Sequence, residues 1–116
     1  MAGVARMGTD TVSTGHLCDT TTHTLVGSSS VFVNGVGACR KGDAITIHKT
    51  KVGDSCVPHS ANINAGSSTV FVDGFSIARN GDAADAGSIS LVTGDAGDSG
   101  SISSGSEDVF AGGKMV

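Results

Sequence analysis

The sequence predicts an all-β fold built from three hairpin units around a common axis. A nine-residue phrase occurs three times along the 116-residue chain, and each copy begins 39 residues after the one before. Its copies are GSSSVFVNG at 27–35, GSSTVFVDG at 66–74 and GSEDVFAGG at 105–113. A fixed interval of this kind indicates an internal structural repeat. One hairpin cannot bury its own apolar face, so the three are expected to lean on one another.

Each copy contains a short Val-Phe-Val or Val-Phe-Ala run, which is typical of a strand with one Phe face and one Val face. We expect the Phe face to lie in the core. The pair that follows is Asn-Gly, Asp-Gly or Gly-Gly, and these residues tolerate positive φ at both central positions of a type I′ turn. Strand, tight turn and strand are therefore predicted in each unit.

A second phrase follows the hairpins and supports a closed ring. It contains Arg40 and Asp43 after the first hairpin, and Arg79 and Asp82 after the second, with Gly at the unusual backbone angle of a turn. A further copy, 5–10, stands before any hairpin. The chain thus enters in mid-repeat, and we expect its last strand to pair close to its first, giving pseudo-threefold symmetry.

Composition limits the class of protein. Eighteen Gly, one Pro, four Phe and no Trp or Tyr supply little core material, so a single domain over 1–116 is expected to need a metal or a partner. A net charge of −4 with scattered Lys and Arg argues against nucleic-acid binding. The first residues resemble no signal peptide, and no run is long enough to span a membrane. We expect synthesis in the cytoplasm and cysteines that stay thiols.

Candidate metal ligands lie in two loops, 11–26 and 44–65, which hold all four histidines. Cys56-Val57-Pro58-His59 is a C-x₂-H pair, and His48 and His16 complete a Cys-His₃ set of the kind that zinc takes. The alternative, that these histidines are exposed and have no special role, stays open at this point.

The remaining Cys and His residues have other interpretations. Cys18 lies two residues after His16 and is an alternative ligand or a buried thiol. His23 stands among threonines and is expected to be a solvated strand residue, and Cys39 aligns with Ala78 as a small packing residue. Cys56 beside His59 resembles a nucleophile and its base, but no G-x-S-x-G motif is present and apolar wall material is scarce. We do not expect an enzyme.

These residues together resemble the PAAR-repeat family, the small conical proteins that cap phage tail spikes and type VI secretion spikes. The resemblance rests on the three hairpin phrases, on ACRKGD and IARNGD, on Thr14-Gly15-His16 and on the Cys56 to His59 pair. It implies a three-sided pointed β structure whose metal ion, zinc or else iron, is bound near the tip by three His and one Cys. On that pattern the ligands are His16, His48, Cys56 and His59. Many relatives have a Cys after the last Gly-Asp, where this chain has 82–85, DAAD.

The resemblance also implies a function. We expect a structural tip protein without catalysis or cargo, which caps a trimeric β-helical spike, one copy per trimer, and meets the target cell envelope transiently when the tail contracts. The expected place is the baseplate spike tip of a phage virion. Three alternatives are a type VI secretion spike tip, a free metal-binding or redox-sensing module using the cysteines, and a small metal-dependent hydrolase.

Overall fold

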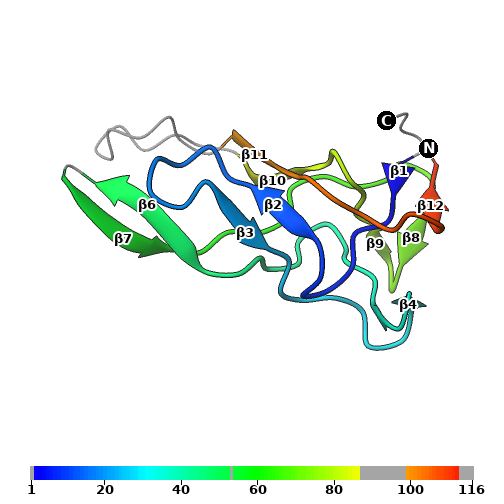
Figure 1. Cartoon of the computed structure of the whole chain (residues 1–116). Coiled ribbons are helices and arrows are strands. Elements are labelled where there is room, and N and C mark those ends of the chain that lie inside the picture. Colours follow the sequence, from blue (N-terminus) through cyan, green and yellow to red (C-terminus); the bar gives the residue numbers. More distant parts are fainter. Residues whose placement is uncertain (1, 53, 87–98, 113–116) are drawn as a thin grey trace.

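The computed structural model describes residues 2–52, 54–86 and 99–112, and within these ranges it contains strands and turns but no helix. The molecule is elongated, with extents of 41 × 24 × 23 Å. The β6–β7 hairpin lies at the narrow end, and β1, β4, β8 and β12 lie at the wide end (Figure 1). The predicted all-β class is confirmed.

The strands are short and every pairing between them is antiparallel. Four strands form one sheet in the order β10-β11-β2-β3, and the other strands pair two by two as β1-β12, β4-β5, β6-β7 and β8-β9. Their bounds are β1 Ala2–Gly3, β2 Thr11–Ser13, β3 Thr21–His23, β4 Phe32–Val33, β5 Val36–Gly37, β6 His48–Val52, β7 Ser55–His59, β8 Phe71–Val72, β9 Phe75–Ser76, β10 Ala83–Ala86, β11 Ser99–Ile102 and β12 Phe110–Ala111.

Two of the predicted tight hairpins are confirmed. In β4–β5 the turn residues Asn34 and Gly35 have φ of 53° and 86°, and in β8–β9 Asp73 and Gly74 have φ of 54° and 83°. Positive φ at both central positions is the type I′ geometry, which matches the right-handed twist of the flanking strands. The second Gly of the third turn, at position 113, lies outside the described residues.

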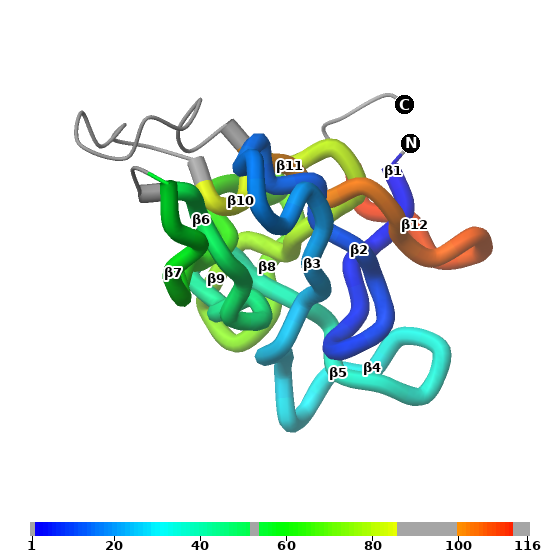
Figure 2. Tube along the Cα trace, turned by 60° about the vertical axis from the view of Figure 1, so that its left-hand side comes forward, coloured from blue at the N-terminus to red at the C-terminus, as the bar shows by residue number. Residues whose placement is uncertain are grey.

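The third hairpin is completed by the other end of the chain. β12 pairs with β1, with Ala2 opposite Ala111 and Gly3 opposite Phe110. β1 therefore occupies the place that β5 and β9 take in the other two units. In Figure 2 the β4–β5 pair lies lowest, β1 and β12 lie on the right, and β8 and β9 lie farther to the left, so the three hairpin regions extend in different directions. The expected closure of the last strand on the first is confirmed.

A ring of backbone hydrogen bonds closes the three units around the axis. The Ala5 N–H donates to the Ala78 carbonyl at 2.9 Å, Ala78 N–H to the Cys39 carbonyl at 2.9 Å, and Cys39 N–H to the Ala5 carbonyl at 3.0 Å. All three residues are fully buried. Each donor has an acceptor in a different unit, so the burial of these polar groups is compensated.

The core consists of small aliphatic side chains stacked along this axis. One cluster lies toward the narrow end and the other toward the wide end, and together they explain how a chain so poor in aromatics folds. The first cluster contains Ala5, Val12, Cys39, Ile45, Ile63, Ala78, Ala84 and Ile102, and the second contains Val4, Val33, Ala38, Val72, Ile77 and Ala111.

The expectation that the Phe face forms the core is wrong. Phe32, Phe71 and Phe110 are 60%, 58% and 48% exposed, whereas the residue after each of them is buried. Successive side chains of a strand point to opposite faces, so only one of the two can face the axis. Three hairpins converge there, and Val or Ala fits the narrow space that remains.

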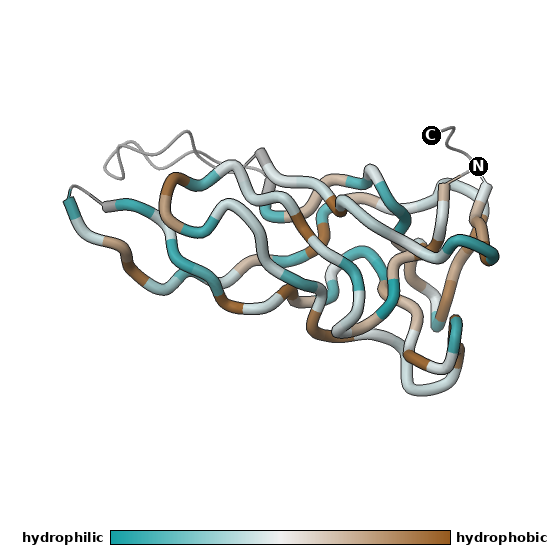
Figure 3. Tube along the Cα trace, viewed as in Figure 1, coloured by the Kyte–Doolittle hydropathy of each residue, from teal (hydrophilic) through white to brown (hydrophobic). Residues whose placement is uncertain are grey.

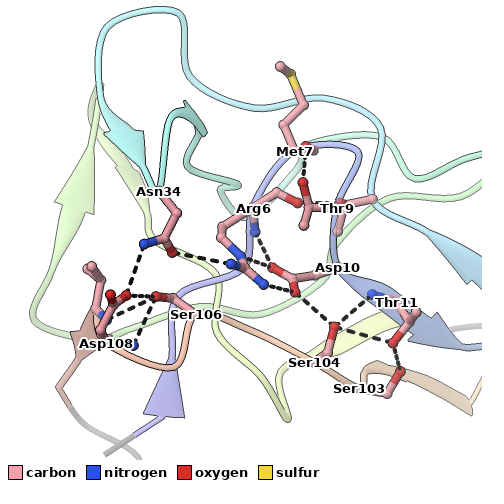
Figure 4. Close-up of polar contacts among 12 residues, drawn as sticks. Arg6, Met7, Thr9, Asp10, Thr11, Asn34, Ser103, Ser104, Ser106 and Asp108 are labelled. Carbon is pink, nitrogen blue, oxygen red and sulfur yellow. Dashed lines mark hydrogen bonds and ion pairs between the residues drawn. The ribbon is translucent and has the colours of Figure 1, made fainter.

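The Arg and Asp of each second phrase form a clamp. Arg40 donates through its backbone N–H and its Nε to Asp43 Oδ2 at 2.8 and 2.9 Å, and Gly42 between them has a φ of 96°. Arg6 and Asp10 make the same contacts in the first unit, where Ser104 also donates to Asp10 (Figure 4). Burial alone would raise the pKa of Asp10, but the hydrogen bonds from Arg6 and Ser104 outweigh burial and hold it below its usual range.

Each clamp continues to the hairpin turn of the next unit. Arg40 Nη1 donates to Asp73 Oδ2 at 2.8 Å, and hydrogen bonds from Ser28 and Ser30 join the same carboxylate. These serine bonds, followed by the charge of Arg40, lower the pKa of Asp73. In the neighbouring junction Arg6 bonds to Asn34, which donates to Asp108 (Figure 4). The three units are therefore linked at the rim as well as on the axis.

The axial ring predicts a strong sensitivity to side-chain size. Ala78→Leu adds volume where three backbones meet, so we expect a loss of about 2–3 kcal/mol in the free energy of unfolding. Cys39→Ala makes the third position like the other two and should lose less than about 1.5 kcal/mol. Urea denaturation checks both variants, and an equally stable Leu variant would contradict the tight ring.

The buried clamp between Arg6 and Asp10 predicts a contribution to the free energy of unfolding that depends on pH. The folded pKa of Asp10 lies below the unfolded value of about 4, so this carboxylate stabilises the fold above that pH. Asp10→Asn should therefore cost about 2 kcal/mol at pH 7. The difference from wild type should shrink as the pH falls through the folded pKa, as measured by denaturation at several pH values. Asp73→Asn, at an exposed turn, is the control and should lose much less.

Candidate metal centre

Three histidines predicted as ligands come together at the foot of the β6–β7 hairpin. His16 lies in the loop between β2 and β3, His48 is the first residue of β6, and His59 is the last residue of β7. Their ring centroids are 4.9–5.2 Å apart. His16 and His48 are buried, with 3% of each residue exposed, and His59 is half-buried.

The fourth member of the cluster is Asp85 of β10. Its Oδ2 lies 2.7 Å from His16 Nε2 and 2.6 Å from His48 Nε2, and its Oδ1 lies 2.9 Å from His59 Nε2. The four possible ligand atoms all lie within 4.8 Å of one another. Three imidazoles from separate parts of the chain therefore converge on one buried carboxylate.

Strand register places two of these histidines. His48 and His59 are directly opposite each other in the β6–β7 pair, so their side chains share a face. Thr50, two residues along, lies on the same face of β6 and is also buried. His16 reaches this face from the neighbouring loop, and its Nδ1 lies 3.1 Å from Thr50 Oγ1.

A bulge directs Asp85 into the cluster. The register of β10 on β11 shifts between Ala83 and Ala86, and Asp85 between them has a φ of 55°. A non-glycine residue seldom adopts this conformation, and such strain, of order 1 kcal/mol, concentrates at functional sites. Bulges re-aim side chains in this way beside binding and catalytic sites. Here the carboxylate is turned inward to meet the imidazoles.

The hydrogen bond of His48 on its other side leaves its Nε2 to share either a proton or a metal ion with Asp85. His48 Nδ1 lies 2.9 Å from the Thr46 carbonyl oxygen, which can only accept, so Nδ1 carries a proton. In the neutral ring Nε2 then has a lone pair, and it faces a carboxylate oxygen at 2.6 Å. Two acceptors do not approach so closely without a proton or a metal ion between them. A backbone carbonyl behind the imidazole is also the usual support of a metal-bound His.

The donor set fits a transition metal. Imidazole nitrogens suit zinc and ferrous iron, and a single carboxylate completes four protein ligands without a soft thiolate. His16, His48, His59 and Asp85 are thus the residues that could hold such an ion. When bound, the ion would tie three segments of the chain together.

The structure differs from the sequence-based ligand set at Cys56. This cysteine forms a disulfide with Cys18, and its sulfur is absent from the group of possible ligand atoms. Cys56 and His59 are three residues apart within a strand, so they lie on opposite faces of it. In a loop, the two side chains of the C-x₂-H pair could face one ion. In the extended strand β7 they cannot. The expectation that all cysteines stay thiols is also wrong.

Cys39 and His23 lie as predicted, whereas Cys18, predicted as an alternative ligand or a buried thiol, is half-buried and bonded to Cys56. Cys39 is fully buried in the axial ring, and burial raises the pKa of its thiol to about 12, which makes it unreactive. His23 is an exposed residue of β3 and lies outside the cluster.

Comparison with known protein families gives the family. The model of the PAAR motif matches residues 14–91, which is more than half of the chain. The chain belongs to the PAAR motif family. All four members of the cluster lie within the matched residues. Among curated proteins, none matches this sequence.

Membership of the PAAR family indicates the general role of this protein. PAAR proteins are structural proteins of the spike-tip type in contractile injection systems, type VI secretion among them; they sit on spike proteins, and their motifs bind metal. No helix in the described residues is long and apolar enough to cross a membrane. The sequence signal that points to Asp85 is its place three residues after Asp82, at the end of the second Arg-x-Gly-Asp phrase.

The Cys-His₃ set predicted from the sequence and the His₃-Asp cluster of the structure give opposite predictions for the metal content of variants. Asp85→Ala removes a converging ligand and should lower zinc affinity at least tenfold, whereas a Cys18→Ser, Cys56→Ser double variant should keep one equivalent of metal. Elemental analysis of the purified proteins measures this. His23→Ala, which removes an exposed histidine outside the cluster, is the matched control. Loss of metal from the Cys double variant with retention in Asp85→Ala would restore the Cys-His₃ set.

Proposed function

We propose that this protein is a metal-stabilised tip that caps the end of a trimeric β-helical spike, one copy per trimer. The observation that carries the proposal is the set of exposed Phe side chains at pseudo-threefold positions on the wide end. Phe32, Phe71 and Phe110 are each 39 residues apart, and each begins the first strand of its hairpin. Exposed aromatic side chains that gather at one end of a small protein are typical of an interaction surface.

The apolar surface continues beside these rings. Val31 and Val109 precede two of them and are more than one third exposed, and Phe75 of β9 is 56% exposed beneath the Arg40 guanidinium, 5.7 Å from its ring centroid. Hydrophobic stretches mark the hairpins at this end (Figure 3). Aromatic side chains surrounded by polar ones are typical of the central part of a protein interface.

Symmetry makes a trimer the fitting partner. A monomer with three like hairpins presents a similar contact to each chain of a threefold-symmetric partner. The blunt end of a β-helix exposes unpaired backbone groups, and a cap that covers them removes an aggregation hazard. The axial ring of Ala5, Cys39 and Ala78 supports this match because it fixes the three hairpins relative to one another.

The narrow end supports the second half of the proposal. An ion held by the His₃-Asp cluster would pin the loop after β2, the β6–β7 hairpin and β10 to one point. Closing long loops with a metal clip stabilises a small fold that has little core. Four protein ligands fill a tetrahedral zinc site, which favours a structural role over hydrolysis, because hydrolysis needs an open position.

The resulting rigid point would meet the target cell envelope first during contraction. The same geometry serves a phage tail and a type VI secretion spike. The virion setting stays a prediction, and the spike that binds the wide end would identify the carrier.

Spike binding tests the docking face. The triple variant Phe32→Ser, Phe71→Ser, Phe110→Ser removes three exposed rings, so it should fold normally and lose at least 100-fold in affinity for a trimeric β-helical spike. Size-exclusion chromatography with light scattering should show one copy of the wild type per trimer.

Two exposed apolar residues at the other end provide the control. Leu17 and Ile47 are 58% and 62% exposed and lie beside the metal cluster. A Leu17→Ser, Ile47→Ser variant should bind the spike as the wild type does. Equal binding by the Phe variant, or loss of binding by the control alone, would place the docking face elsewhere.

A further inference from the structure

We propose that the Cys18–Cys56 disulfide is a redox-controlled clasp on the metal centre, so that oxidation of the disulfide and binding of the metal strengthen each other. This inference deepens the proposed function and rests on it for its biological setting. It stands on the placement of the disulfide and of the candidate metal ligands, which join the same two segments of the chain.

The disulfide and the cluster join the same parts. Cys18 lies two residues after His16 in the loop between β2 and β3, and Cys56 lies three residues before His59 in β7. The two sulfurs are bonded across a sequence separation of 38 residues. The path from His16 to His59 through the disulfide therefore consists only of 16–18 and 56–59.

Loop-closure entropy couples the two links. Bringing His16 to His59 closes a long loop when the cysteines are reduced and a short one when they are bonded, and the cost rises with loop length. Hydrogen bonds between Asp19 and Lys49, at 2.6 and 3.1 Å, already hold the two segments near each other. The coupling is therefore smaller than for a free chain, and we expect about a tenfold change in metal affinity.

The Cys18–Cys56 disulfide is accessible to reductants. Cys56 is exposed on the outer face of β7 and Cys18 is half-buried, so an attacking thiolate has access. Cys39, the third cysteine, is fully buried on the axis. Its thiol, with a pKa raised to about 12 by burial, does not compete in exchange. Cys18 and Cys56 are therefore the two cysteines that exchange, and each has the other as its partner.

The chemistry is thiol–disulfide exchange. In oxidation, the two thiols lose two protons and two electrons and form the S–S bond, while a small-molecule or protein disulfide takes up the electrons and becomes two thiols. Reduction runs in reverse, with two equivalents of a thiol as the electron donor. The His₃-Asp ligands take no part in the electron transfer.

This arrangement suits a tip that is assembled in reducing surroundings and used in oxidising ones. In the reduced protein only hydrogen bonds, such as those between Asp19 and Lys49, and the cluster join the two segments, so the metal enters a site that opens more easily. Outside the reducing compartment the disulfide forms, and both the ion and the point become harder to displace. The wide end, at the opposite end of the molecule, is unaffected.

Zinc affinity in two redox states tests the clasp. Wild-type protein is titrated against a chromophoric zinc chelator, once oxidised and once after reduction with a phosphine, and the oxidised form should bind zinc about tenfold more tightly. By reciprocity, saturating zinc should shift the equilibrium between disulfide and dithiol toward the disulfide by the same factor. Alkylation and mass spectrometry measure the thiols in buffered glutathione, with and without zinc.

Cysteine variants and a spike-binding assay distinguish a failure of the redox clasp from a failure of the proposed spike-tip function. Oxidised Cys18→Ser, Cys56→Ser protein should bind zinc as the reduced wild type does, and Cys39→Ala, which keeps the disulfide, should behave as the oxidised wild type. Equal zinc affinity in both redox states overturns the clasp, as does a lack of zinc binding in either state. Spike binding should be the same for oxidised and reduced protein, so its loss or retention reports on the proposed function alone.

Discussion

The closed ring of backbone hydrogen bonds among Ala5, Cys39 and Ala78 is the constraint on which the rest of the structure depends. Three chain segments can meet on one axis only if the side chains there are small, and the core accordingly consists of Ala, Val, Ile and one Cys. The aromatic residues are consequently placed on the outside. A fold with so narrow a core cannot rely on burial alone, and its Arg–Asp clamps and turn-to-turn hydrogen bonds provide the additional links.

Symmetry is retained at one end of the molecule and lost at the other. The hairpins, clamps and rim contacts repeat in all three units, which presents like surfaces to a threefold partner. The connecting loops share no such pattern: one supplies His16, the next supplies His48 and His59, and β10 supplies Asp85. The four possible ligands of the candidate centre therefore come from places in the chain that are not equivalent in the repeat.

The candidate centre is assembled at a cost that a cation would offset. Asp85 has an unfavourable backbone angle, and without a proton or a metal ion between them His48 Nε2 and the carboxylate of Asp85 would be two acceptors 2.6 Å apart. Burying a charge without a partner is far more costly than either feature. A metal ion bound by all four side chains would balance the carboxylate and satisfy the ring nitrogens. The disulfide beside it reduces the entropy lost when the same segments are brought together.

The sequence by itself determined the repeat, the turn type at Asn34-Gly35 and Asp73-Gly74, the pairing of the first and last strands, and the grouping of three histidines. These follow from local chemistry and from spacing along the chain. Tertiary structure alone decided the outward direction of the Phe rings, the disulfide of Cys56 and the inward turn of Asp85. Each of these depends on which face of a strand a residue occupies. A bulge or an extended segment changes that face, and the spacing of residues in the sequence does not reveal the change.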